Sequence, residues 1–497
     1  MSTESTPGEN PQTGREPQQG RLFRWFERRT GLNKLLHEAL DEPIPGGARY
    51  AYIFGSGLLF IFISQVITGI FLALYYVPSA DHAHVTVAYI TKVVAAGSFL
   101  RSLHVYGASA MVIIVLLHLS QTFLYGSYKG RRELLWVSGT LLFTLVMGMA
   151  FTGYLLPWDQ KAYFATAVGT SVASEAPFVG GLLERLMRGG NQIGTLTLSR
   201  FFAMHVFYIP ALIFLFVAIH IYLFRKAGAA GPISESPVRP KQHTESFYPR
   251  QLVMDLGFAL LLIVALGFAA YFAPAALGPL ADPADTHFLP RPEWYYRPLF
   301  EWLKVGHGQA EFLRIVVIPG IIVALFVGLP FLDRRLERRP WRRPAAVGVF
   351  SVIFIALVTL GAYSYYQDSH DKDVAMQLEQ QHRMEVQFMN QPFMPQLANG
   401  AEPPPDQTAE AAAPASPVGA EGEKIFQSHG CYACHGQGGA GTSFAPKLRG
   451  IGSKFSTAQL ETLFEHPLPQ MNAGGMPHFK FTPDQVEALR TYLDSLH

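Results

Sequence analysis

The chain has 497 residues and a formal net charge of +2, with 49% hydrophobic and only 15% charged residues. This balance is typical of membrane proteins and argues against a soluble globular enzyme. The small net charge gives no indication of a nucleic-acid partner.

Residues 1–20 are polar and rich in Gly, Pro, Gln and Glu, which predicts a disordered tail rather than a secretory signal. Long apolar runs with few charges then follow one another along the chain. Each is long enough to cross a bilayer as a helix. We expect seven spans, at about residues 50–77, 103–125, 134–157, 201–224, 252–274, 312–332 and 345–366.

The Lys and Arg residues alternate between the connections. One set of connections holds twenty and the other seven, and the richer set lies at residues 21–49, 129–132, 225–250 and 334–343. Since cytoplasmic loops carry the excess of positive charge, we expect a cytoplasmic N-terminus. Residue 367 onward would then lie on the periplasmic side of a bacterial inner membrane, facing outward.

Four histidines lie on two of these apolar runs, fourteen residues apart at His104 and His118 and fifteen apart at His205 and His220. On an α-helix these spacings rise about 21 and 22 Å and return to within about 40° and 60° of the same face. Core histidines are the alternative, but ionisable side chains are costly in hydrocarbon. Matched depths predict His104 with His205 and His118 with His220 as axial ligands of two haems.

Glycines and arginines accompany the histidines. Four glycines repeat the fourteen-residue spacing and would let the backbone approach a haem face, namely Gly55 with Gly69 and Gly139 with Gly153. Four arginines are candidates for the haem propionates, with interfacial anchoring as the alternative; they are Arg101 and Arg200 on the outer side and Arg132 and Arg225 on the cytoplasmic side.

The C-terminal part carries a second redox motif. Residues 367–420 read as a surface helix followed by an Ala- and Pro-rich linker. The sequence Cys431-Tyr432-Ala433-Cys434-His435 then predicts covalent haem attachment with His435 as axial ligand, rather than a redox thiol pair. A methionine should be the sixth ligand, and Met476 is preferred over Met471 because GGMPHF resembles the ligand loop of small class I cytochromes c.

The segments SFLRSLHVYGASAMVIIVLLHL, TGYLLPWDQKAYFA, LSRFFAMHVFYIPALIFLFVAIHIYLF and PEWYYRPLF resemble cytochrome b of the quinol-oxidising bc and bf complexes. The resemblance implies an all-α fold, a seven-span bundle with a C-terminal soluble domain similar to class I cytochrome c. Residues 21–244 would form a four-span dihaem domain, 245–366 a three-span domain similar to subunit IV, and 421–497 the cytochrome c domain. Ile53 stands where bf relatives attach a third haem through cysteine, so we expect none there.

The resemblance also assigns reaction residues. Glu293, in Pro292-Glu293-Trp294-Tyr295, would accept a quinol proton once a partly apolar pocket raises its pKa. An interfacial aromatic belt is the alternative for this segment. Tyr295 and Tyr154 would line the quinol pocket beside a short amphipathic helix within residues 158–199. Asp255 is the candidate at a second, cytoplasmic quinone site.

Together these features predict the cytochrome b subunit of a proton-translocating quinol:cytochrome c oxidoreductase. Electrons from quinol would divide between two paths, one through two non-covalent haems b and one towards the fused haem c. A Rieske iron-sulfur protein must be a separate partner, because this chain lacks the cysteines for its cluster. Further cytochrome c subunits, a soluble cytochrome c or terminal oxidase, and a second copy in a homodimer are expected partners. The alternative is a multihaem membrane conduit without quinol bifurcation.

Overall fold

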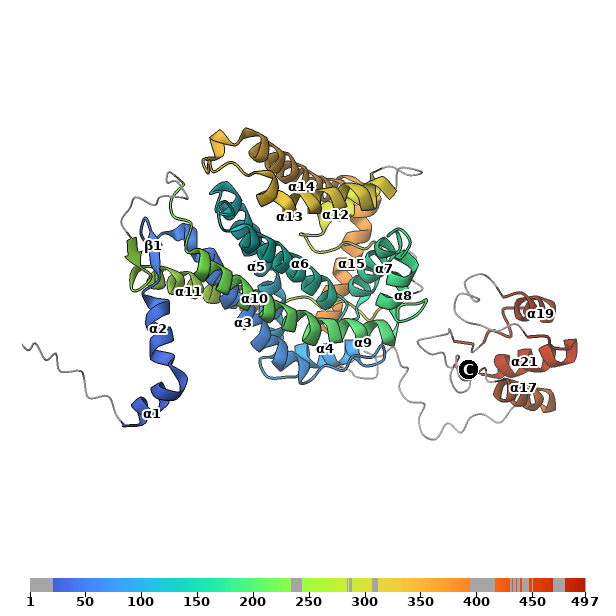
Figure 1. The fold of residues 1–497 in the computed structure, drawn as a ribbon. Coiled ribbons are helices and arrows are strands. Elements are labelled where there is room, and N and C mark those ends of the chain that lie inside the picture. The colour runs from blue at the N-terminus through green and yellow to red at the C-terminus, as the bar shows by residue number, and fades with distance from the viewer. Residues whose placement is uncertain are drawn as a thin grey trace, which may run out of the picture.

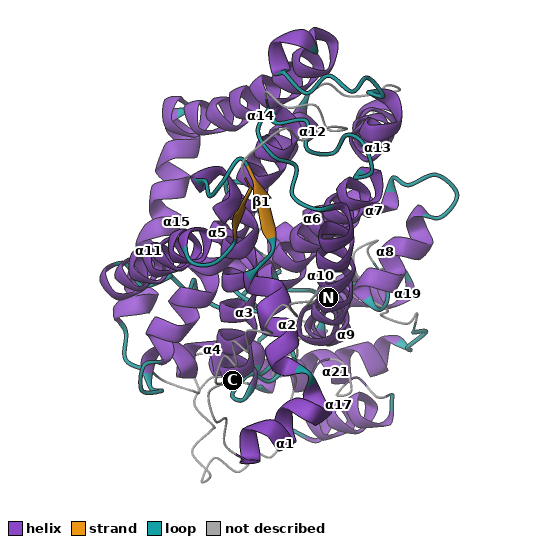
Figure 2. Ribbon diagram, turned by 60° about the vertical axis from the view of Figure 1, so that its left-hand side comes forward, coloured by secondary structure: helices purple, strands orange, loops and turns teal. Residues whose placement is uncertain are grey.

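The computed structural model is mostly helical (Figures 1 and 2). It describes residues 21–233, 244–283, 285, 288–305, 312–393, 416–429, 431, 435, 439, 447–448, 450–467 and 479–496. The predicted tail at residues 1–20 therefore lies outside the described residues.

Seven helices are long and apolar enough to cross a membrane, as the sequence predicts. They are η1–α3 (Tyr50–Tyr52, Ile53–Ala73), α5 (Gly97–Leu124), α6 (Glu133–Tyr154), α9–η2–α10 (Thr195–Ala203, Met204–Tyr208, Ile209–Ala227), α11 (Arg250–Phe272), η3–α13 (Leu313–Val317, Ile318–Leu332) and α14 (Pro344–His370). The second and fourth begin earlier than the apolar runs, so Arg101 and Arg200 lie within helices.

Shorter elements lie at the two ends of the spans. The helices are α1 (Arg21–Thr30), α2 (Leu32–Leu40), α4 (Ala83–Lys92), α7 (Gln160–Ser174), α8 (Gly180–Arg188), α12 (Arg297–Lys304), η4 (Pro340–Arg342) and α15 (Lys372–Asn390). Strand β1 (Pro43–Pro45) pairs antiparallel with β2 (Thr244–Ser246). Helix α8 lies in the segment expected to be amphipathic. We call the end of the bundle with residues 292–295 the PEWY end, and the end with residues 333–343 the basic end.

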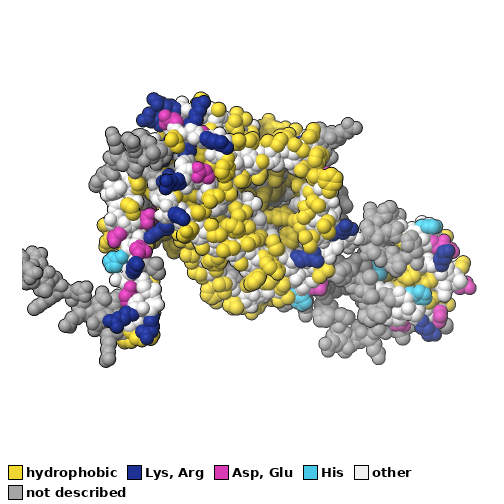
Figure 3. All heavy atoms as spheres, viewed as in Figure 1, with side chains coloured by type: hydrophobic (Ala, Val, Ile, Leu, Met, Phe, Trp, Pro, Cys, Tyr) yellow, Lys and Arg dark blue, Asp and Glu magenta, His cyan; other side chains and the backbone are white. Residues whose placement is uncertain are grey.

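Two helix pairs build the centre of the bundle, α3 with α5 and α6 with α10, while α11 covers α3 and α5. Many side chains of the spans remain exposed in the isolated chain, and Figure 3 shows a broad apolar surface bounded by a cluster of Lys and Arg at one end. Exposing so much apolar surface to water is unfavourable, so these side chains must contact lipid or another apolar partner. The chain is therefore an integral membrane protein.

The C-terminal part has a small core of its own. Helix α17 (Pro417–Ser428) packs on α21 (Pro483–Ser495), and α19 (Thr457–Glu465) also contacts α21. Phe426, Leu489 and Tyr492 are buried there, and Cys431 packs against the same cluster. The haem-attachment motif thus begins beside the apolar core of this part.

A buried ionic network ties the basic end together. Asp333 lies 2.7 Å from Lys129 and 3.5 Å from Arg343, and both cations have side chains only 2% exposed. Tyr128 donates its hydroxyl to the same carboxylate at 2.6 Å. Burial raises the pKa of Asp333, but hydrogen bonds from Lys129 and Tyr128 and the nearby positive charges outweigh it and hold the pKa below its usual value.

We expect Asp333→Ala to destabilise the protein by about 3–5 kcal/mol, because it leaves two buried cations without their counter-charge. Glu337→Ala is the control, since Glu337 pairs with Arg342, which is 60% exposed, and such pairs contribute about 0–1 kcal/mol. Thermal unfolding of the purified protein checks both. Because the folded pKa of Asp333 is lowered, its contribution is present at neutral pH and is lost as the pH falls through that pKa. Equal melting temperatures for Asp333→Ala and Glu337→Ala would contradict the predicted stabilising role of Asp333.

Candidate functional site

Each predicted histidine ligand faces one predicted glycine. A Cβ added to Gly69 would lie 3.2 Å from Cε1 of His104, and one added to Gly153 would lie 2.4 Å from Cε1 of His205. The corresponding distances are 3.8 Å from Gly55 to His118 and 3.3 Å from Gly139 to His220. The glycines therefore leave room for the imidazole rings themselves. The spacing had suggested instead that they let the backbone approach a haem face. Helix α3 receives both histidines of α5, and α6 receives His205 of η2 and His220 of α10.

Hydroxyl groups hold three of the four rings at Nδ1. The Thr68 hydroxyl lies 3.0 Å from His104 and the Ser138 hydroxyl 2.9 Å from His220. Each hydroxyl donates its single proton to a backbone carbonyl one turn earlier in its helix, Ser64 and Leu135 respectively. It can therefore only accept from the ring, so Nδ1 carries the proton and Nε2 is left with its lone pair.

His205 is held in a related way. Its Nδ1 lies 3.0 Å from the carbonyl of Met149 and 3.4 Å from the Thr152 hydroxyl, whose own proton goes to Gly148. A carbonyl can only accept, so Nδ1 again carries the proton. This arrangement is the one that metal-ligating histidines use to fix their tautomer.

A π-helical turn over Met204–Tyr208 contains His205. Pro210 follows this turn and has no N–H to donate, which favours the wider turn. A π-turn holds one residue more than an α-turn, so it absorbs the difference between the fifteen-residue and the fourteen-residue spacing. His205 and His220 therefore both face α6, at Gly153 and Gly139. On a regular α-helix, the fifteen-residue spacing would instead rotate one of them by about 60° relative to the other.

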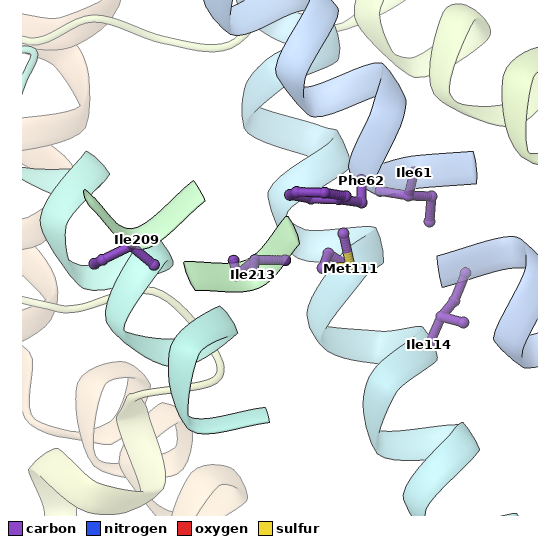
Figure 4. Packing of buried hydrophobic residues seen from close by; sticks show 6 residues of the cluster. All are labelled: Ile61, Phe62, Met111, Ile114, Ile209 and Ile213. Carbon is purple, nitrogen blue, oxygen red and sulfur yellow. The ribbon is translucent and has the colours of Figure 1, made fainter. Parts of the chain in front are cut away.

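An apolar cluster lies between the two histidine levels (Figure 4). Met111 is seven residues from both His104 and His118, and Ile213 is seven residues before His220. Ile61, Phe62, Ile114 and Ile209 complete the cluster, with exposures between 0% and 8%. The packing separates the two levels with apolar side chains.

The spacing of the histidine pair at the PEWY end is compatible with the predicted bis-histidine haem. The ring centres of His104 and His205 lie 6.1 Å apart. Two metal–nitrogen bonds of about 2.0–2.1 Å on opposite sides of one ion place imidazole centres about 6 Å apart. With the protons on Nδ1, both Nε2 atoms are available for such bonds. His118 and His220, which face Gly55 and Gly139, remain the predicted second pair.

The four arginines proposed for propionates all bind backbone carbonyls. Arg101 donates to Ala275 at 2.7 Å and Ala276 at 2.6 Å, and it is buried. Arg132 donates to Gly228 at 3.2 Å, at the end of α10. Arg200 binds the carbonyl of Leu186 and Arg225 that of Glu38. These contacts give each arginine a structural role, and their contact with a propionate stays a prediction.

Glu293 lies partly buried in the loop before α12. Burial raises the pKa of its carboxyl above the usual value, against the opposing charges of Lys161 and Arg297. Lys161 also binds Glu385 of α15 at 2.6 Å, so α15 reaches the same region. A carboxyl in this setting can take up and release a proton nearer to neutral pH than an exposed glutamate can.

Two tyrosines of this loop, Tyr295 and Tyr296, and Tyr154 at the end of α6 are placed around Glu293 or hold the loop to α6. The charge of Glu293 acts on the hydroxyls of both Tyr154 and Tyr295, and burial raises the pKa of Tyr295. Tyr296 donates its hydroxyl to the carbonyl of Met147 at 2.6 Å. Met147 lies two residues from Met149, whose carbonyl holds His205, so one stretch of α6 contacts both the loop and a predicted haem ligand.

Asp255 lies at the basic end of α11 and is 8% exposed. Gln251 donates to it at 2.8 Å and accepts the backbone N–H of Arg49 at 2.8 Å. The carboxylate is therefore part of a contact between α11 and the segment before α3. This position is compatible with its predicted role at a second quinone site, which stays a prediction.

In the C-terminal part, Cys431 and His435 are described, whereas Cys434, Met471 and Met476 lie outside the described residues. Several contact residues at the membrane site were missed by the sequence reasoning, namely Thr68, Ser138, Thr152, Tyr296 and Asp368. A signal for the first three exists, because each directly precedes one of the spaced glycines. Of the four spaced glycines, only Gly55 is preceded by an apolar residue, Phe54.

Residues 39–228 match the family Cytochrome b/b6/petB, residues 280–380 match Cytochrome b(C-terminal)/b6/petD, and residues 419–497 match Cytochrome c. A cytochrome bc complex cytochrome b subunit of Chlorobaculum thiosulfatiphilum is 33% identical over 352 residues, which cover 69% of this chain and 80% of the relative. A menaquinol:cytochrome c reductase cytochrome b subunit of Bacillus subtilis is 38% identical over 43% of this chain and 99% of its own length.

Another relative, named Cytochrome b/c1, from Bradyrhizobium diazoefficiens, is 33% identical over 68% of this chain and 50% of its own length. Among solved structures, a chain of a hyperthermophilic respiratory Complex III superposes with a TM-score of 0.62 at 25% identity. It covers 76% of this chain and 99% of the other.

We expect Gly153→Ala to remove the haem at the PEWY end, because the new methyl group would lie 2.4 Å from His205, which Met149 holds in place. About half of the b-haem absorbance should be lost, with the c-haem band unchanged. Gly148→Ala on the same helix is the control, since its Cβ would meet Ile209 at an ordinary 3.8 Å. Retention of the full b-haem spectrum in Gly153→Ala would show that this ring does not bind haem.

Proposed function

Since the chain belongs to the cytochrome b family and is the cytochrome b subunit of a bc-type quinol:cytochrome c reductase, we propose that it oxidises quinol beside Glu293 with bifurcated electron transfer. The PEWY end would face outward and the basic end the cytoplasm. Protons would be released outside and taken up inside, which builds a proton gradient. The observation that carries this proposal is the short stretch of α6 at which Met147 contacts the PEWY loop and Met149 contacts His205.

The proposal assigns each protein group a step. Glu293 accepts a proton from the quinol hydroxyl, because its raised pKa suits proton exchange near neutral pH. Tyr295 and Tyr154 line the ring site around it. His104 with His205 and His118 with His220 would hold two b haems, which when bound would supply one-electron transfer along the bundle.

At the basic end, Asp255 would supply a proton to the second quinone, with Gln251 orienting its carboxylate at 2.8 Å. The C-terminal part would carry a covalent haem c on Cys431 and Cys434, with His435 and Met476 as axial ligands. It would receive the electron that leaves through a separate Rieske iron-sulfur partner. A further cytochrome c subunit, a soluble cytochrome c or an oxidase would take it onward, and the complex would be a homodimer.

A membrane conduit that relays electrons without quinol bifurcation is the alternative function. A conduit needs the histidines but has no use for a partly buried glutamate with a raised pKa. The position of Glu293 and the loop contact to α6 therefore favour quinol oxidation.

We expect Glu293→Gln in the assembled complex to lower quinol-driven cytochrome c reduction by about a hundredfold, as the loss of a positioned base does. Since the carboxyl must be deprotonated to accept a proton, the wild-type rate should rise with pH through the raised pKa of Glu293, and the variant should lack this acidic limb. Glu379→Gln on α15 is the control, because this side chain is 57% exposed. Unchanged turnover in Glu293→Gln would exclude bifurcation at this site.

The haem content gives an independent check. Pyridine haemochrome spectra of the purified chain should give about two haems b for each haem c, since two bis-histidine sites and one attachment motif are assigned. A different ratio would contradict the ligand assignment, whatever the turnover of the complex.

A further inference from the structure

Two arginines frame the PEWY segment. Arg291 precedes Glu293 by two residues and Arg297 follows it by four. Both side chains meet a single carboxylate, that of Asp368, near the end of α14. The loop is thus bound on both sides of Glu293 to one point on the seventh span.

The geometry of this contact is that of a strong ion-pair cluster. Arg291 donates through a terminal nitrogen to Oδ1 of Asp368 at 2.8 Å and through Nε to Oδ2 at 3.1 Å, which makes a bidentate pair. Arg297 reaches Oδ2 of the same carboxylate at 2.6 Å and stacks on Tyr365 at 4.0 Å. The three charged side chains are only 10–13% exposed, so solvent screens the cluster weakly.

The backbone of Glu293 lies inside this clamp. Its carbonyl accepts the N–H groups of Tyr296 at 2.9 Å and Arg297 at 3.2 Å. Tyr296 in turn binds Met147 of α6. A shift of Arg297 would therefore move the turn that carries Glu293 relative to α6.

Asp368 also balances charge. Arg297 stabilises the charged form of Glu293, and Asp368 supplies the nearest opposite charge to that guanidinium. Without Asp368, the guanidinium of Arg297 would lose its paired carboxylate. The aspartate thus holds in place the guanidinium that acts on the charge of Glu293.

We infer that Asp368 is a positioning residue for quinol oxidation, which acts through Arg291 and Arg297 to hold Glu293 at the substrate. The inference rests on the proposed role of Glu293. A carboxylate on the last span would then determine the reactivity of a loop more than seventy residues earlier in the chain.

The test is quinol-driven cytochrome c reduction by the assembled complex carrying Asp368→Asn, Asp368→Glu or Asp371→Asn. Asp368→Asn should lower turnover about tenfold, because a misplaced catalytic group loses rate steeply. Asp368→Glu should recover most of that loss, since it keeps the charge. Asp371→Asn should act as wild type, because Asp371 only caps α15 through Asp373 and Val374, a role that asparagine also fills.

A double variant separates positioning from general stability. If Asp368 acts through Glu293, then Glu293→Gln with Asp368→Asn should be no slower than Glu293→Gln alone. Multiplied losses, wild-type turnover of Asp368→Asn, or an Asp368→Asn complex that fails to retain its b haems would each overturn the inference. Normal turnover of Glu293→Gln would instead overturn the proposed function, so the two failures are distinguishable.

Discussion

The close approach of four imidazole rings to four glycines is the constraint on which the membrane part depends. An imidazole in the apolar interior needs a partner for Nδ1 and space for the ring, and α3 and α6 supply both within one turn. A glycine makes the space. The hydroxyl residue before it accepts the ring proton of His104 and His220, and for His205 the nearest acceptor is the carbonyl of Met149. The pairing of α3 with α5 and of α6 with α10 follows from these contacts.

Helix α6 connects the two halves of the proposed chemistry. One of its faces receives His205 and His220, while its carbonyl at Met147 anchors the loop with Glu293. The same helix contacts α13 near the basic end, where Trp136 donates to Phe326 at 2.8 Å. With these three contacts, α6 positions the proposed proton acceptor and a predicted haem ligand relative to each other, as electron and proton transfer from one substrate would require.

The spans, the histidine spacing and the haem-attachment motif could be predicted because each depends on local sequence. Apolar length predicts a span, and residues fourteen apart share a face of any α-helix. Local signals were also overlooked. Three of the spaced glycines follow a hydroxyl residue, and a proline follows His205. The sequence does not show which histidine ring each hydroxyl contacts, or that the proline leaves a backbone carbonyl of the π-turn without its usual N–H donor.

The sequence by itself determined an integral membrane protein with seven spans, cytochrome b character and a C-terminal cytochrome c part. Only the tertiary structure decided that the arginines proposed for propionates bind backbone carbonyls, that a π-turn brings the histidine spacings into register, and that Asp368 clamps the loop of Glu293. Periodicity records which residues share a helix face. Contacts between residues more than seventy positions apart depend instead on how the helices pack, and no local pattern encodes them.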